Sequence, residues 1–278
     1  MLKSENQSRS VTPVRESIYQ PEQQGLKFPQ IPSFEMVDEE RQHRKERLVA
    51  ACRAFAEQGF SYGSAGHISV RDPENSDLYW TNPMAVHFAQ VTMSSLVLAN
   101  HEGKVVEGDY AINRAGFVLH AAVHRGNPDI VAMCHAHTPH GVAWCAMGRP
   151  LDPITQDACR FYGTHAVVND EGGAVSVEAG QGAGVVEAFA DNRAILHQNH
   201  GLITASRHSV DDAAWAFIAL EAACRVQLLV EATGKRPTYV TPERAQHTVK
   251  HTGSEYIGWL HFQPVYANIV KTNPDMFD

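Results

Sequence analysis

The stretch MCHAHTPHG, residues 133–141, sets three histidines within six positions directly after an apolar run. Together with PDIVA (128–132) it predicts a buried strand that ends in the histidines, and Pro139 suits the first turn of a following helix. Side chains two apart in a strand point to the same side, so His135 and His137 can approach one ion. Neutral imidazole is a common ligand for zinc and iron. The alternative reading is a set of hydrogen-bonded surface or core-edge histidines.

A third candidate ligand, His200, lies in QNHGLIT (198–204), at a tight turn between two predicted strands. Three nitrogen ligands with one open position are typical of a catalytic rather than a structural metal site. His140 falls in the helix beyond the histidine pair, where a capping or surface role competes with a role as catalytic base. The three histidines of the opening stretch are therefore not equivalent.

Strand and helix patterns alternate on both sides of this stretch. Apolar spacing, caps and glycine stops predict helices at 39–59, 114–126 and 209–234, and strands within 67–72, 77–82, 96–109 and 192–206. Because strands and helices are intermingled along the chain, we expect an α/β fold. The predicted architecture is a single three-layer α/β/α domain with a central, mainly antiparallel sheet.

The chain divides into three segments by composition. Residues 1–36 are rich in Ser, Gln, Glu and Pro, which predicts a disordered or extended N-terminal arm. Residues 37–234 form the predicted domain. Residues 235–278 form a C-terminal arm whose aromatic stretch YIGWLHFQPVY (256–266) is too apolar to be a free tail. We expect this arm to pack on the domain or on a neighbouring subunit.

Charge and cysteine content exclude several classes of partner. The formal net charge of -8 argues against nucleic acid or acidic lipid as partners. The sequence shows no apolar stretch of the roughly 20 residues needed to span a bilayer, and no secretory signal. The five cysteines form no CxxC pair, which suits a reducing compartment. We expect a cytoplasmic protein with a small-molecule substrate.

Five stretches occur in an order that resembles the class II aldolase/adducin family: residues 65–72, 96–109, 120–145, 153–163 and 194–206. The resemblance covers about residues 40–232, and the family includes fuculose-phosphate aldolase, ribulose-phosphate epimerase and the adducin head domain. It implies a fuculose-phosphate aldolase-like fold and a homotetramer. It also implies that His135, His137 and His200 bind a divalent ion, with Zn²⁺ expected and Fe²⁺ as the alternative.

The sequence departs from the sugar-phosphate enzymes of this family at the reacting centre. They carry an acid/base carboxylate four positions before the histidine that matches His120, and here that position is Gly116. Their phosphate-binding turns are replaced by Gly66-His67, NPMA (82–85) and Asn113-Arg114. A phosphate site needs small residues that let backbone N–H groups approach the anion. An ordinary sugar-phosphate aldolase is not expected, although Arg114 is a candidate to bind a substrate carboxylate.

Other polar residues are candidates for the acid/base role of the missing carboxylate. His67, which replaces an asparagine of the aldolase turn, and Asp157 are the candidate catalytic residues, and Gln156 is a candidate substrate-binding residue. The alternative for Asp157 is a structural role in a turn or as a helix cap. His120 and His124 share a helix face at i, i+4 spacing, which predicts a buried, hydrogen-bonded pair.

Three functions fit these observations. The first is a metal-dependent lyase, of the aldolase or decarboxylase type, that acts on a small non-phosphorylated carbonyl or carboxylate compound through a metal-stabilised enolate. The second is a non-haem iron oxygenase for an aromatic 2-oxo acid, because the GHI and TQD features resemble an aminocoumarin-pathway branch of the family. The third is an adducin-like, actin-binding scaffold without turnover. The retention of all three histidines favours an enzyme.

Overall fold

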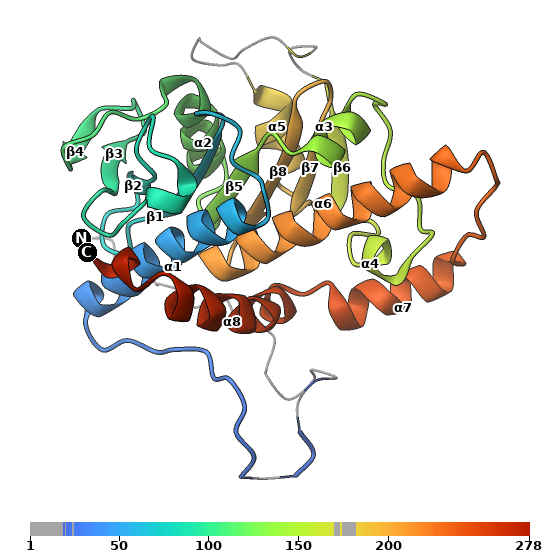
Figure 1. Ribbon diagram of the computed structural model, residues 1–278, viewed down its shortest axis with the longest axis horizontal. Coiled ribbons are helices and arrows are strands. Elements are labelled where there is room, and N and C mark those ends of the chain that lie inside the picture. The colour runs from blue at the N-terminus through green and yellow to red at the C-terminus, as the bar shows by residue number, and fades with distance from the viewer. Residues whose placement is uncertain (1–18, 20, 24, 170–172, 174–181) are drawn as a thin grey trace, which may run out of the picture.

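An eight-stranded sheet runs through the part of the chain that the computed structural model describes, which is residues 19, 21–23, 25–169, 173 and 182–278. The strand order is β4-β3-β2-β1-β5-β8-β7-β6 (Figure 1). The strands are β1 (Gly66–Arg71), β2 (Leu78–Thr81), β3 (Val97–Asn100), β4 (Val105–Glu107), β5 (Ala132–Ala136), β6 (His165–Val168), β7 (Ala194–His197) and β8 (Gly201–Ser206). All pairs are antiparallel except β6 with β7.

Helices cover both faces of this sheet, which confirms the predicted three-layer α/β/α architecture (Figure 1). The helices are α1 (Val37–Glu57), α2 (Arg114–Gly126), α3 (Pro139–Cys145), α4 (Gln156–Cys159), α5 (Ala183–Ala188), α6 (Val210–Ala232), α7 (Pro242–Thr252) and α8 (Glu255–Thr272), with short 3₁₀ turns at Phe88–Gln90 and Pro274–Phe277. Helices α1 and α6 pack on one face of the sheet, and α2 and α5 pack on the other.

Alternation along the central strands decides which side chains meet which layer. Ile68 and Val70 of β1 join the core that contains α1 and α6, whereas Ser69 points to the opposite face and contacts α2. In β5, Cys134 joins the α1 and α6 core and Met133 joins the core under α2 and α5. Apolar residues on both faces of these strands are expected for a sheet covered on both sides. His135 therefore belongs to the face that α2 and α5 cover.

Helix α6 is the central helix of one layer. By length and composition it could cross a membrane, but it packs against the sheet, α1, α3 and α8. Ser209 caps its N-terminus by accepting a hydrogen bond from the Asp212 N–H at 3.2 Å, as the sequence predicted. Its apolar composition is that of a helix buried on most sides.

The two ends of the chain add structure around the domain. Of the predicted N-terminal arm, residues 1–18, 20 and 24 lie outside the described residues, and residues 25–36 contain no helix or strand. The C-terminal segment forms α7 and α8, and α8 packs on α6 and α1 (Figure 1). Sequence patterns did not separate β6, α4 or α5, because each has six residues or fewer and no clear period.

Candidate metal centre

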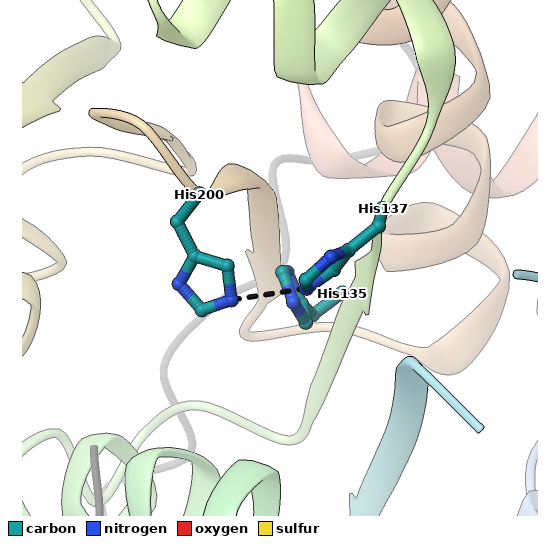
Figure 2. A group of neighbouring side chains, drawn as sticks. All are labelled: His135, His137 and His200. Carbon is teal, nitrogen blue, oxygen red and sulfur yellow. Dashed lines mark hydrogen bonds between the residues drawn. The ribbon is translucent and has the colours of Figure 1, made fainter. Parts of the chain in front are cut away.

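Three histidines converge where β5 ends and the β7–β8 turn begins (Figure 2). His135 lies in β5, His137 follows that strand by one residue, and His200 lies in the turn between β7 and β8. Antiparallel pairing of β5 with β8 brings the two segments together. One nitrogen of each ring lies within 4.8 Å of the others, and His137 Nε2 is 3.0 Å from His200 Nε2. The structure thus brings together the three histidines that the sequence selected.

The ring of His135 is oriented by the backbone. Its Nδ1 lies 2.8 Å from the carbonyl oxygen of Leu202. Because a carbonyl can only accept, Nδ1 carries the proton and Nε2 presents a lone pair. That Nε2 is buried and has no hydrogen-bond partner among the described residues. A ligating histidine usually holds its second nitrogen in this way, so the donor set fits a divalent ion.

His200 is held by a residue that the sequence reading missed. Its Nδ1 lies 3.0 Å from Nδ1 of His197, the last residue of β7. Asn199 between them has a φ of 59°, a left-handed conformation that asparagine tolerates better than most residues. The only sequence signal for His197 is its position three residues before His200 in a tight turn.

Burial keeps the candidate ligands in the form that binds metal. Desolvation, followed by the neighbouring histidines, lowers the pKa of His200 to about 3. Desolvation also lowers the pKa of His137, and it places the pKa of His135 well below the ordinary value. Neutral imidazole is the ligating state, so at neutral pH protons do not compete strongly for these nitrogens.

A cavity of about 320 Å³ opens beside the three histidines. Half of its lining residues are small or apolar and half are His or Asn, and within the described part of the chain no Lys, Arg, Asp or Glu lines it. The lining residues are Ala65, His67, Asn113, Ala115, Gly116, Leu119, His135, His137, Val142, Gly173, Asn199 and His200. This wall suits an uncharged or aromatic group better than a phosphate.

His67 occupies the space in which a side chain at position 116 would begin. Gly116 has an ordinary helical backbone in the first turn of α2, but a Cβ atom there would lie 1.8 Å from both Cε1 and Nε2 of His67. His67 reaches this place from β1, where it pairs in register with His135. Desolvation lowers the pKa of His67 to about 4. The predicted loss of an acid at Gly116 is therefore matched by an imidazole in the same space.

The other predicted site residues lie away from the cavity wall. Arg114 is exposed at the start of α2, between two residues that line the cavity. Gln156 and Asp157 are exposed in α4, where Asp157 forms an ion pair with Arg160 at 3.2 Å. Neither α4 residue lines the cavity. The described chain thus does not bring Gln156 and Asp157 to the three histidines.

His140 is directed to α6 rather than into the cavity. Its Nδ1 lies 2.8 Å from Oε1 of Glu221, a buried carboxylate of α6. Glu221 also accepts from Thr138 Oγ1 at 2.5 Å and from the N–H groups of His140 and Gly141 at 3.1 and 2.6 Å. This carboxylate caps the N-terminus of α3 and fixes the segment that follows His137. An acidic residue inside a long helix gave no sequence signal for that role.

His120 and His124 form a buried pair, as their spacing predicted. Both rings hydrogen-bond Ser69 Oγ, at 2.7 Å from His120 Nδ1 and 2.9 Å from His124 Nε2. His120 is 1% exposed and His124 is 0% exposed. This pair lies between α2 and β1, directly behind the cavity wall that Gly116 and His67 form.

Comparison with known proteins gives consistent matches over most of the chain. Residues 46–228 match the family described as Class II Aldolase and Adducin N-terminal domain. Decarboxylase NovR of Streptomyces niveus is 39% identical, over 90% of this chain and 92% of that protein. A 4-hydroxy-3-prenylphenylpyruvate oxygenase/4-hydroxy-3-prenylbenzoate synthase of Streptomyces roseochromogenus subsp. oscitans is 38% identical, over 88% of each chain. The solved L-fuculose 1-phosphate aldolase of Glaciozyma antarctica PI12 superposes with a TM-score of 0.82 at 37% identity, and the match covers 90% of this chain and 97% of that one.

Proposed function

Because this chain belongs to the class II aldolase and adducin family, we propose that it is a divalent-metal-dependent lyase of the aldolase or decarboxylase type. Its substrate in this proposal is a small, non-phosphorylated carbonyl or carboxylate compound. The observation that carries the proposal is the convergence of His135, His137 and His200 at a cavity, with the buried Nε2 of His135 lacking a partner among the described residues. Three such nitrogens fit Zn²⁺, and Fe²⁺ is the alternative.

The cavity wall supports the absence of a phosphate group from the substrate. A phosphate dianion needs cationic side chains or several free backbone N–H groups. The described part of the wall holds no cation, and Arg114 lies outside it. Gly116 supplies no carboxylate, and His67 fills its side-chain space. We therefore place the likeness to the fuculose-phosphate enzyme at the level of the fold.

The metal would polarise a substrate oxygen as a Lewis acid, which stabilises developing negative charge by several kcal/mol. The chain's own residues then have two tasks. His67 faces the cavity beside His135 and supplies a ring nitrogen that can accept a proton or a hydrogen bond from the substrate. Leu119 and Val142 exclude water from the reacting end of the substrate.

The remaining parts of the proposal concern assembly and location. The exposed Arg114 would reach the site from the rim of the cavity. Residues Gln156 and Asp157 would reach a site only in a second copy of the chain, so their roles depend on the homotetramer that we also propose. We place the protein in the cytoplasm, supported by five free, buried cysteines.

A second candidate is a non-haem iron oxygenase acting on an aromatic 2-oxo acid. Two observations favour it: the relative that is 38% identical is a 4-hydroxy-3-prenylphenylpyruvate oxygenase by name, and the apolar lining around Leu119, Val142 and Ala115 suits an aromatic ring. Three histidines can hold iron as well as zinc. In this reading the same cavity and the same ligands serve an oxidative cleavage.

Metal analysis of protein purified without a His-tag tests the proposal. We expect about one divalent ion per chain, lost in a His135→Ala, His137→Ala double variant and retained in the exposed control His247→Ala. Zinc with carbon–carbon cleavage of 2-oxo or hydroxy acids in an anaerobic assay supports the lyase, whereas iron with oxygen consumption supports the oxygenase. Turnover of L-fuculose 1-phosphate contradicts a non-phosphorylated substrate. Wild-type protein without metal, unchanged by the double variant in fold and activity, refutes both enzyme proposals.

A further inference from the structure

A chain of buried hydrogen bonds lies behind His67, between β1 and α2. His124 Nδ1 is 3.2 Å from the carbonyl oxygen of Ile130, and His124 Nε2 is 2.9 Å from Ser69 Oγ. Ser69 Oγ is also 2.7 Å from Nδ1 of His120. The three side chains are almost completely buried. Because these groups are buried, their hydrogen-bond partners must come from the protein itself.

The Ile130 carbonyl sets the direction of every hydrogen bond in this chain. A carbonyl only accepts, so His124 Nδ1 carries the proton and its Nε2 is an acceptor. The Ser69 hydroxyl must then donate to His124 Nε2, and its oxygen must accept from His120 Nδ1–H. His120 is thereby fixed with its proton on Nδ1 and a lone pair on Nε2.

The reverse direction leaves one contact without a proton. If Ser69 donated to His120, His124 would have to donate through Nε2, and its bare Nδ1 would face the Ile130 oxygen lone pair to lone pair. A doubly protonated His124 could avoid this conflict, but burial and Arg71 lower the pKa of His124 to about 3. At neutral pH only the first arrangement pairs every donor with an acceptor.

The fixed lone pair of His120 lies on a ring that contacts the ring of His67. His120 Nε2 is buried without a hydrogen-bond partner among the described residues, and so is Nδ1 of His67. The two ring centres lie 5.2 Å apart in an edge-on arrangement. A buried acceptor without a donor is destabilising, so a small rotation that pairs the rings is favoured. On its other side, Nε2 of His67 reaches the position beside Gly116 in the cavity wall.

We propose that Ser69, His120 and His124 are positioning residues that fix the proton of His67. His120 Nε2 accepts the ring N–H of His67, so the other ring nitrogen of His67 faces the cavity as a hydrogen-bond acceptor. The consequence for specificity rests on the proposed function: beside the metal ligands the site takes a substrate that offers a donor, such as a hydroxyl group, at this point. A substrate with only acceptor oxygens there would meet a lone pair.

Histidine-selective ¹⁵N labelling with two-bond ¹⁵N–¹H spectra of the metal-free protein tests this inference without any activity assay. These spectra distinguish a ring protonated at Nδ1, at Nε2 or at both. The rings of His67, His120 and His124 are assigned by single His→Asn variants. We expect His67, His120 and His124 each to show a single form at pH 7 with the proton on Nδ1, so that Nε2 of His67 is bare.

Matched variants separate positioning from general stability. In Ser69→Ala, His120 should lose its single form and show a mixture of the two neutral forms. His120→Gln keeps an acceptor near the Nε2 position and should preserve the single form of His67, whereas His120→Asn shortens the side chain and should abolish it. His247→Ala on exposed α7 should change nothing.

The wild-type spectrum decides the proposal even if a variant fails to fold. His120 protonated at Nε2, or doubly protonated at pH 7, overturns it. A His67 ring that keeps one form in His120→Asn overturns the link between the two rings. Because the spectra need neither metal nor substrate, a failed metal analysis refutes the proposed enzyme function and leaves this result standing.

Discussion

A Cβ atom on Gly116 would lie 1.8 Å from Nε2 of His67. The two positions therefore share one volume, with the side chain supplied from β1 rather than from α2. The backbone of Gly116 is helical, so space and not conformation requires glycine there. This shared volume accounts for two departures from the sugar-phosphate enzymes, which are the missing acid at Gly116 and the histidine at position 67. A larger residue at 116 would exclude the imidazole of His67.

Gly116→Ala should destabilise the protein by about 1–3 kcal/mol, since the new methyl group must displace a ring packed between His120 and His135. In a His67→Ala background the same substitution should be neutral or slightly stabilising, because alanine is the better helix former. Urea unfolding of the four proteins of this cycle measures the coupling. Additive effects of the two substitutions would contradict the shared volume.

His197→Phe should weaken metal binding by about 10–100-fold, because it keeps a ring in place but removes the hydrogen bond that orients His200. Calorimetric titration of the metal-free protein with Zn²⁺ measures the affinity, with His247→Ala as the control on exposed α7. An affinity within twofold of the wild type would show that His197 does not orient the ligand.

The sequence was sufficient for the parts of the site that depend on local pattern. A strand that ends in HxH and a turn that contains His200 identified three residues whose nitrogens lie within 4.8 Å of one another. The three-layer fold followed from the order of strands and helices. These features depend on period and spacing, which a sequence displays directly.

Contacts between distant segments could not be predicted. That His67 fills the space at Gly116 depends on how α2 is placed against β1, and the capping of α3 by Glu221 joins residues about 80 positions apart. Asp157 was chosen by resemblance and by chemistry, yet α4 places it on the surface. The sequence shows the chemical type of each of these residues, but it does not show which residues each one contacts in the fold.

Glu221→Gln should lower the free energy of unfolding by about 1–3 kcal/mol, because an amide has one accepting oxygen, whereas Oε1 of Glu221 accepts from the His140 N–H and Oε2 accepts from Thr138 and the Gly141 N–H. The same variant should weaken metal binding, since Thr138 adjoins His137. Glu231→Gln, at the exposed end of the same helix, is the matched control and should change stability by less than about 1 kcal/mol. Urea unfolding and zinc titration give the two readouts, and equal effects of the two variants would exclude the capping role.

The lowered pKa of His124 predicts that the free energy of unfolding falls as the pH decreases. Burial lowers its pKa from about 6.5 in the unfolded chain to about 3 in the folded protein. Between these values the unfolded chain binds the extra proton, so the contribution to stability is fully present above pH 6.5 and falls as the pH decreases toward 3. From pH 7.5 to 5.5 the loss is about 1 kcal/mol.

The raised pKa of Asp212, about 7 because of its burial, acts with the opposite sign, since the folded state then holds the extra proton. Comparison with a His124→Asn variant removes this background, because Asp212 is present in both proteins. We expect urea unfolding of the metal-free wild type to show about 1 kcal/mol more loss between pH 7.5 and 5.5 than the variant shows. Equal losses in the two proteins would mean that folded His124 takes up its proton over the same pH range as the unfolded chain, which contradicts the lowered pKa.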